Sequence, residues 1–101
     1  MTQYRGRRTI DGISVSVDGR PLDDCLSVYV YDNKGFEWSY IGSSPSQLAL
    51  ALLMDHLNDA EKAKALVESF VENVIANLDN DWELTSEDID RALATPGSFS
   101  G

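Results

Sequence analysis

Residues 35–48 constrain the fold more than any other part of this chain, because a strand pattern there leads through a short turn directly into a helix start. The aromatic residues Phe36, Trp38 and Tyr40 occupy every second position. Alternate side chains of a strand lie on one face of a sheet, so this period of two is typical of a strand. The sequence therefore predicts a strand over Phe36–Ile41.

The residues after this turn carry the signals of a helix N-terminus. Ser44 is a suitable N-cap, Pro45 fits the first helical position because its missing N–H would be unpaired there, and Gln47 completes a capping box. The residues that follow are apolar almost all round, which is typical of a helix buried on most of its surface. We predict that Pro45–Leu57 is the central helix of the core.

The first third of the chain contains further strand patterns. Tyr4–Ile10 and Ile13–Val17 are β-prone runs joined by Asp11-Gly12, a pair favoured in hairpin turns. Ser27–Tyr31 alternates in the same way as the aromatic segment. These runs predict three or four antiparallel strands within the first 41 residues.

Helix patterns dominate the remainder of the chain. Asn58, with Glu61 three positions later, is a suitable cap for a second helix, whose apolar residues recur at helical spacing as far as Leu78. A short extended link is predicted at Trp82 and beyond. Thr85 then caps a last helix.

Together these elements predict one α+β domain, in which an antiparallel three- to four-stranded sheet packs against three helices. The last helix is expected to end at Pro96-Gly97, so we assign residues 1–97 to the domain and residues 98–101 to a flexible C-terminal tail. The single cysteine, Cys25, excludes an intramolecular disulfide. No apolar run approaches the roughly 20 residues that cross a bilayer, so we expect a soluble, cytoplasmic protein with no membrane partner.

The charge of the chain is unevenly distributed. Residues 1–34 contain five basic and five acidic side chains, whereas residues 35–101 contain three basic and twelve acidic ones, which accounts for the whole net charge of -9. Such a surface repels phosphate backbones and attracts basic partners. We therefore expect a basic protein surface as partner and no direct binding to nucleic acid.

The sequence contains no complete catalytic signature. Gly42-Ser43-Ser44-Pro45 lies between a strand pattern and a helix, as a nucleophilic serine would, but the second glycine of that motif is missing. The one histidine, His56, is twelve residues beyond Ser44 and so about 18 Å away along the helix. The serine has no base within reach, and we expect the protein not to be an enzyme.

Residues 79–90 include several acids at spacings similar to those of a calcium-binding loop. Leu84 stands where that loop needs glycine, and Asp90 replaces the glutamate that closes the site. We therefore predict neither a metal site nor a cofactor.

Three segments of the chain resemble a known family. These segments are Tyr4-Arg5-Gly6, the run from Gly35 through Ser44-Pro45-Ser46-Gln47 to Ala51, and Trp82-Glu83-Leu84-Thr85. In them the chain is similar to an uncharacterised small-domain family of bacteria, archaea, phages and plasmids. The resemblance implies a shared α+β fold without a known activity, and an origin in mobile genetic elements.

The acidic surface and the family resemblance together predict a small, non-enzymatic protein-binding module. In its most concrete form it is a mobile-element inhibitor, similar in role to an anti-CRISPR protein, that occupies a basic, nucleic-acid-binding surface of a host defence factor. The residues expected to contact the partner are Glu61, Glu68, Glu72, Asp79, Asp81, Glu83 and Glu87.

Two other classes stay open at this point. A small-ligand or anion-binding domain would use Arg5 and Arg7 together with Ser43 and Ser44, because free N–H groups and the helix dipole favour anions at a helix start. A structural or dimerising subunit would instead associate through a sheet edge or an uncovered aromatic face.

Overall fold

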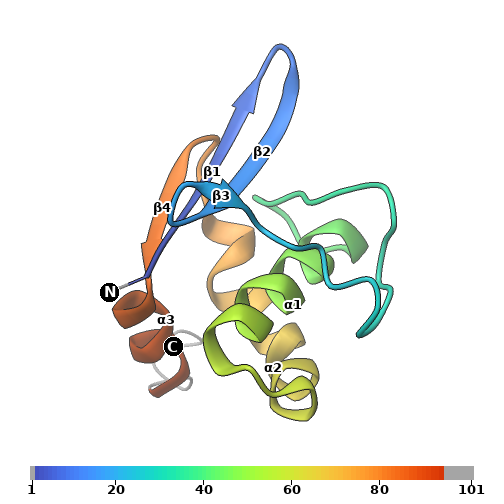
Figure 1. The fold of residues 1–101 in the computed structure, drawn as a ribbon, viewed down its shortest axis with the longest axis vertical. Coiled ribbons are helices and arrows are strands. Elements are labelled where there is room, and N and C mark those ends of the chain that lie inside the picture. The colour runs from blue at the N-terminus through green and yellow to red at the C-terminus, as the bar shows by residue number, and fades with distance from the viewer. Residues whose placement is uncertain (1, 95–101) are drawn as a thin grey trace.

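The computed structural model describes residues 2–94 as a four-stranded antiparallel sheet and three α-helices (Figure 1). The strands follow the order β3 (Arg20–Pro21), β2 (Gly12–Val17), β1 (Gln3–Thr9) and β4 (Trp82–Thr85) across the sheet. This arrangement confirms the predicted α+β class. The elements in chain order are β1 (Gln3–Thr9), β2 (Gly12–Val17), β3 (Arg20–Pro21), α1 (Ser43–Leu57), α2 (Ala60–Asn73), the 3-10 helix η1 (Ile75–Asn77), β4 (Trp82–Thr85) and α3 (Ser86–Ala94). The predicted helix end at Pro96-Gly97 and the predicted tail at 98–101 lie outside the described residues.

Strands β1 and β2 form the predicted hairpin, which projects from the body of the molecule in Figure 1. Its register runs from Tyr4 opposite Val17 to Thr9 opposite Gly12. Gly12 has φ +121°, a backbone conformation that residues with a Cβ rarely adopt, so glycine suits this turn.

The predicted strands at Ser27–Tyr31 and Phe36–Ile41 are wrong. Both segments belong to a connection without regular secondary structure, residues 22–42, which we call the 22–42 connection. β1 already has a neighbour on each side, because β4, predicted only as an extended link, fills the position opposite β2. Ser39 has φ +78°, which interrupts an extended backbone. Of the three alternating aromatic residues only Trp38 is buried, and Tyr40 is 49 % exposed, so the alternation does not correspond to one face of a strand.

The start of α1 also differs from the prediction. The helix begins at Ser43 with Gly42 as its N-cap, and no side chain forms a capping hydrogen bond. The prediction that Ser44 is the N-cap is therefore wrong, although the predicted helix itself is confirmed and is only two residues longer at its start.

Gln47, predicted to complete a capping box, instead supports the 22–42 connection. Its side chain is buried, with the residue only 1 % exposed. Its Oε1 accepts hydrogen bonds from the backbone N–H groups of Tyr31 (2.7 Å) and Asp32 (3.2 Å). Its Nε2 donates to the carbonyl oxygens of Asp24 (2.7 Å) and Tyr29 (3.1 Å). All four hydrogen bonds of a primary amide are thus made within the protein.

Of the two caps predicted for the other helices, one is wrong and one is confirmed. Asn58 is not the cap of α2 but the left-handed C-cap of α1, with φ 53°. Asp59 caps α2, because its side chain accepts from the backbone N–H of Lys62. Thr85 caps α3 as predicted: its Oγ1 accepts from the Asp88 N–H, and the Thr85 N–H donates to the Asp88 carboxylate.

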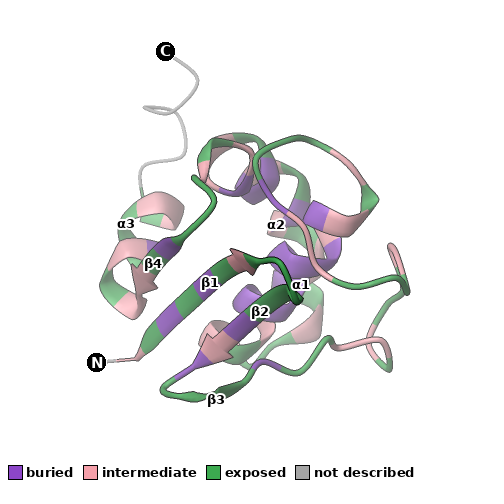
Figure 2. Cartoon of the chain, turned by 90° about the horizontal axis from the view of Figure 1, so that it is seen from above, coloured by how far each residue is buried: buried purple, intermediate pink, exposed green. Residues whose placement is uncertain are grey.

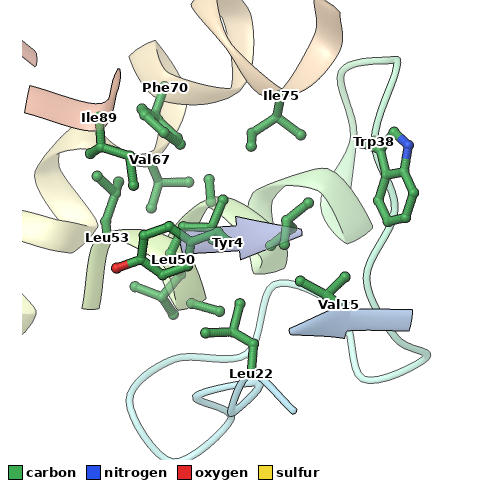
Figure 3. Close-up of a cluster of buried hydrophobic side chains, with 14 of the residues drawn as sticks. Tyr4, Val15, Leu22, Trp38, Leu50, Leu53, Val67, Phe70, Ile75 and Ile89 are labelled. Carbon is green, nitrogen blue, oxygen red and sulfur yellow. The ribbon is translucent and has the colours of Figure 1, made fainter. Parts of the chain in front are cut away.

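The core lies between the sheet and the helices. Along β1, buried and exposed residues alternate, as the bands in Figure 2 show, so one face of the sheet is covered. Leu48 to Leu53 of α1 are all fully buried, which confirms this helix as the centre of the core. Tyr4 points into this cluster with Leu50 and Phe70 (Figure 3), and its hydroxyl donates to Asp55 of α1 at 2.7 Å.

Candidate functional site

The three segments that carry the family resemblance meet in one aromatic cluster. Trp38 and Trp82 pack edge to face, with ring centroids 5.7 Å apart and an interplanar angle of 89°. Gly6 pairs with Trp82 across the β1–β4 ladder, and a Cβ at position 6 would lie 2.3 Å from the Trp82 indole. Both indole N–H groups are buried, with no acceptor among residues 2–94. The packing of the cluster explains why position 6 is glycine.

Arg8 joins this cluster to the 22–42 connection. Its guanidinium carbon lies 4.6 Å from the centroid of the Trp38 ring, within the range of a cation–π interaction. It also donates to Glu37 at 2.5 Å, to the Trp38 carbonyl at 2.9 Å and to Asn80 at 2.7 Å. The sequence suggested Arg8 only as a helper in anion binding, together with Arg5 and Arg7, and it did not predict the contacts with Trp38 and Glu37. Arg8 lies on the same face of β1 as the buried residues Tyr4 and Gly6, because side chains two residues apart in a strand point to one side. This spacing was the signal in the sequence that Arg8 faces the interior.

The N-terminus of α1 already faces a carboxylate of the protein itself. Ser43 Oγ donates to Asp32 at 2.8 Å, and the backbone N–H of Lys34 donates to the same carboxyl group at 2.7 Å. These bonds, the Lys34 N–H first and then the hydroxyls of Ser43 and Ser44, hold the pKa of Asp32 below its usual range. Asp32 and Ser44 line a cavity of about 630 Å³ beneath the 22–42 connection.

The predicted anion site is not assembled. Arg5 lies on the open face of the sheet, where its Nε is 3.4 Å from Glu83 of β4. Arg7 follows on the same face, opposite Ser14 of β2. This face is turned away from the helices, whereas Ser43 and Ser44 lie at the start of α1 beside Asp32. The four residues therefore form two separate groups.

The acids predicted on the second helix lie along its exposed side. Glu61, Glu68 and Glu72 are all solvent-exposed in α2, seven and four residues apart. Glu61 pairs with Lys64 at 3.6 Å. Glu68 and Glu72 have no ion-pair partner within the described part of the chain. Two uncompensated carboxylates therefore stand one helical turn apart.

Glu68 and Glu72 border a groove between α2 and the 22–42 connection. The groove has a volume of about 340 Å³. Its other lining residues are Tyr31, Ile41, Ser46, Lys64, Val67 and Val71. We call this feature the α2 groove. Acidic and apolar side chains thus line the same concave surface.

The remaining predicted acids lie elsewhere. Asp79 and Asp81 border a shallow polar cavity of about 580 Å³ between η1 and β4. Glu83 is engaged by Arg5 on the sheet, and Glu87 lies in the first turn of α3. The seven acids therefore do not form a single surface, and two of them, Glu68 and Glu72, line the α2 groove.

Large apolar side chains in the 22–42 connection are exposed close to this groove. Tyr29, Val30, Tyr40 and Ile41 are 50 %, 54 %, 49 % and 66 % exposed. The Tyr29 ring packs against the groove residue Tyr31 in a tilted arrangement, with ring centroids 4.7 Å apart and an interplanar angle of 54°. These exposed apolar side chains are available for contact with another molecule. The sequence predicted that an uncovered aromatic face could serve for association, but it placed these residues on strands of the sheet, whereas they lie in the irregular 22–42 connection.

The comparison with known families agrees with the resemblance of the three segments. Residues 4–95 match a family described as "Family of unknown function (DUF6166)", a range that runs from β1 to the end of α3. The chain belongs to the DUF6166 family. No curated protein and no solved structure matches it. The predicted membership in an uncharacterised small-domain family is confirmed.

His56 of this DUF6166 chain has a structural partner. Its Nε2 lies 2.6 Å from an Asp90 carboxylate oxygen, which joins the last turn of α1 to α3. Ser44 lies at the opposite end of α1, so the two residues cannot form a nucleophile–base pair within one chain.

Cys25 is a weakly reactive thiol. Burial first, and then the nearby carboxylates of Asp23 and Asp24, raise the pKa of Cys25 to about 11. The thiolate is the nucleophilic form of cysteine, so little of it is present at neutral pH.

Within residues 2–94, no group of three or more histidine, cysteine, aspartate or glutamate side chains is placed to hold a metal ion. The acidic segment 79–90 consists of a short loop at 79–81, strand β4 and the capped start of α3. None of the described helices is both long and apolar enough to cross a membrane.

Proposed function

We propose that this DUF6166 protein is a small, acidic, non-enzymatic module that binds a basic surface of another protein in the cytoplasm. The observation that carries the proposal is the α2 groove, where the uncompensated carboxylates of Glu68 and Glu72 adjoin the half-buried ring of Tyr31 and the exposed side chain of Ile41. Protein interfaces commonly combine an aromatic or apolar centre with a polar rim.

The charge of the whole molecule supports a basic partner. With a net charge of -9, the protein attracts cationic surfaces over distances longer than direct contact, which accelerates association at low salt. Basic surfaces that bind nucleic acid carry the complementary charge. The most concrete form of the proposal is therefore a mobile-element inhibitor that covers such a surface on a host defence factor, as an anti-CRISPR protein does.

The proposal is tested by competition with DNA. Purified CRISPR effector–guide RNA complexes are incubated with the protein, and the binding of labelled target DNA is followed by fluorescence anisotropy. If a complex is the partner, we expect the protein to prevent DNA binding when it is added first. The inhibition should weaken steeply with salt, because exposed charges are screened beyond about 8 Å at physiological ionic strength.

A second experiment tests for partners other than CRISPR effector complexes. The immobilised protein captures partners from host lysate at low salt, and each captured protein is purified and its affinity is measured directly. We expect Glu68→Lys with Glu72→Lys to abolish binding while the fold is retained. An affinity that is insensitive both to these reversals and to salt would contradict the proposal. Self-association in place of capture would favour the dimerising subunit.

A further inference from the structure

The α2 groove has two chemically different walls. Tyr31 and Ile41 of the 22–42 connection form the first wall, and Glu68 and Glu72 of α2 border the second. Its volume of about 340 Å³ is at the lower end of the range for ligand pockets, so it accommodates a few side chains rather than a folded element.

Contacts with the core hold the floor of the groove and the Tyr31 backbone of its first wall. Val67 and Val71 are 3 % and 2 % exposed, so the floor is part of the core. The backbone N–H of Tyr31 is fixed by the buried amide of Gln47 at 2.7 Å. A surface that is already positioned loses less conformational entropy when a ligand binds.

The charges that line the groove favour a positively charged ligand. Lys64, the one basic residue in the lining, is engaged by Glu61, whereas Glu68 and Glu72 have no partner within the described residues. An Arg or Lys side chain combines an apolar stem with a cationic head. In the groove, the stem would lie along Ile41 while the head reaches the carboxylates.

We infer that the α2 groove binds an extended segment of the partner in which arginine or lysine residues alternate with aliphatic residues. The inference rests on the proposed function and identifies the part of the partner that is recognised. The aliphatic residues of the segment contact Tyr31 and Ile41, and its basic residues pair with Glu68 and Glu72. Asp79, Asp81 and Glu87 lie outside this contact.

A defined peptide tests the groove without knowledge of the partner. The ¹⁵N-labelled protein is titrated with the acetylated, amidated peptide Arg-Leu-Arg-Leu-Arg, and amide chemical shifts are followed by NMR. We expect saturable changes at Ile41 and along residues 67–72. The peptides Arg-Gly-Arg-Gly-Arg and Glu-Leu-Glu-Leu-Glu should bind more weakly, the first because it lacks the apolar contact and the second because its charge is repelled.

Matched variants distinguish binding at this groove from a general attraction of the basic peptide to the negative charge of the molecule. Glu68→Gln with Glu72→Gln should weaken peptide binding about tenfold, which corresponds to about 1.4 kcal/mol. Asp79→Asn with Asp81→Asn removes the same charge from the η1–β4 cavity and should leave the affinity within about twofold. Ile41→Ser tests the apolar wall at an exposed position, and we expect it to abolish the advantage of leucine over glycine.

The outcomes distinguish this inference from the proposed function. Chemical-shift changes centred on residues 79–81, or equal losses of peptide affinity for the two double variants, would overturn the groove as the binding site. Either result would still agree with the proposed acidic binding module. The absence of saturable binding by the basic peptide would also overturn it. The proposed function fails separately, when the captured partner binds independently of salt and of charge reversal.

Discussion

At the scale of single residues, Gln47 shows where sequence reasoning about local motifs reaches its limit. A glutamine three positions after a serine fits a capping box, and nothing nearby indicates a different role. The four groups that it binds lie between 15 and 23 residues earlier in the chain. Its role therefore depends on a tertiary fold that no local pattern specifies. Arg8 illustrates the same limit, since it reaches Glu37 and Asn80 from β1.

Replacement of Gln47 tests its role as the support of the 22–42 connection. Gln47→Leu leaves two half-buried N–H groups and two carbonyl groups without their partner. Because an unsatisfied buried polar group costs about 1–3 kcal/mol and solvent can reach part of this region, we expect a loss of about 3 kcal/mol in the free energy of unfolding. Urea unfolding at pH 7 measures it, with Ser44→Ala as the milder comparison. Equal losses of stability for Gln47→Leu and Ser44→Ala would instead support the interpretation of Gln47 as part of a capping box.

Gly6 provides a second test at this scale. A Cβ at position 6 would lie 2.3 Å from the Trp82 ring, so Gly6→Ala forces the indole away from Trp38. Overpacking of this kind costs about 1–3 kcal/mol. We expect this loss in urea unfolding together with a change in the near-UV circular dichroism of the tryptophans. In Gly6→Ala combined with Trp82→Leu, the cost of the alanine should be smaller than in the wild-type background, and strictly additive effects would exclude the clash.

At the scale of elements, helices and the hairpin were predictable because their signals are local. The β1–β2 turn, the apolar run of α1 and the capped start of α3 each lie within a short stretch of sequence. The sheet order was not predictable in this way. The alternation in Phe36–Ile41 is a stronger strand pattern than the four residues of β4, yet β4 pairs with β1. Its Trp82 is opposite the one residue of that strand without a side chain, Gly6.

The start of α3 should have a defined pH dependence. The backbone N–H of Thr85, and then its hydroxyl and Arg91, lower the pKa of Asp88. A lowered folded-state pKa stabilises the fold above the unfolded-state value, and this contribution is lost as pH falls through the folded-state value. We expect Asp88→Asn to cost about 1 kcal/mol at pH 7, as the loss of a helix cap does.

The measurement is urea unfolding of wild type and Asp88→Asn between pH 2 and pH 7. The difference between them should be constant above about pH 5 and should shrink as the wild-type carboxyl is protonated. Asp81→Asn is the matched control, because the Asp81 carboxylate has no hydrogen bond within the described residues. A difference for Asp88→Asn that persists unchanged at pH 2 would show that its carboxylate charge contributes nothing.

At the scale of the whole molecule, charge was predictable from the sequence but its arrangement was not. The net charge of -9 and the exposed α2 acids were evident, whereas the division of the seven predicted acids among the α2 groove, the η1–β4 cavity and other positions depends on the fold. The same holds for the apolar wall of the groove, because Ile41 is placed there by the irregular path of the 22–42 connection.

The acidic pair at the groove should reduce the stability of the protein that carries it. Glu68 and Glu72 are like charges four residues apart in one helix, an arrangement that costs about 0.2–0.5 kcal/mol. Glu72 also lies in the last turn of α2, where negative charge opposes the helix dipole and no basic residue compensates it. The overall negative charge adds further repulsion. We therefore expect Glu68→Gln with Glu72→Gln to raise the free energy of unfolding by about 0.5 kcal/mol at low salt.

Urea unfolding at low and at high sodium chloride checks this expectation. The gain should shrink as salt is added, because screening already relieves the repulsion in the wild type. Asp79→Asn with Asp81→Asn, which changes the net charge equally outside a helix, should give a smaller gain. A stabilised variant that has lost its basic ligand would show that the two glutamates are required for binding at a cost to folding. A destabilised variant would mean that these glutamates support α2, and its loss of binding would then carry no information about the groove.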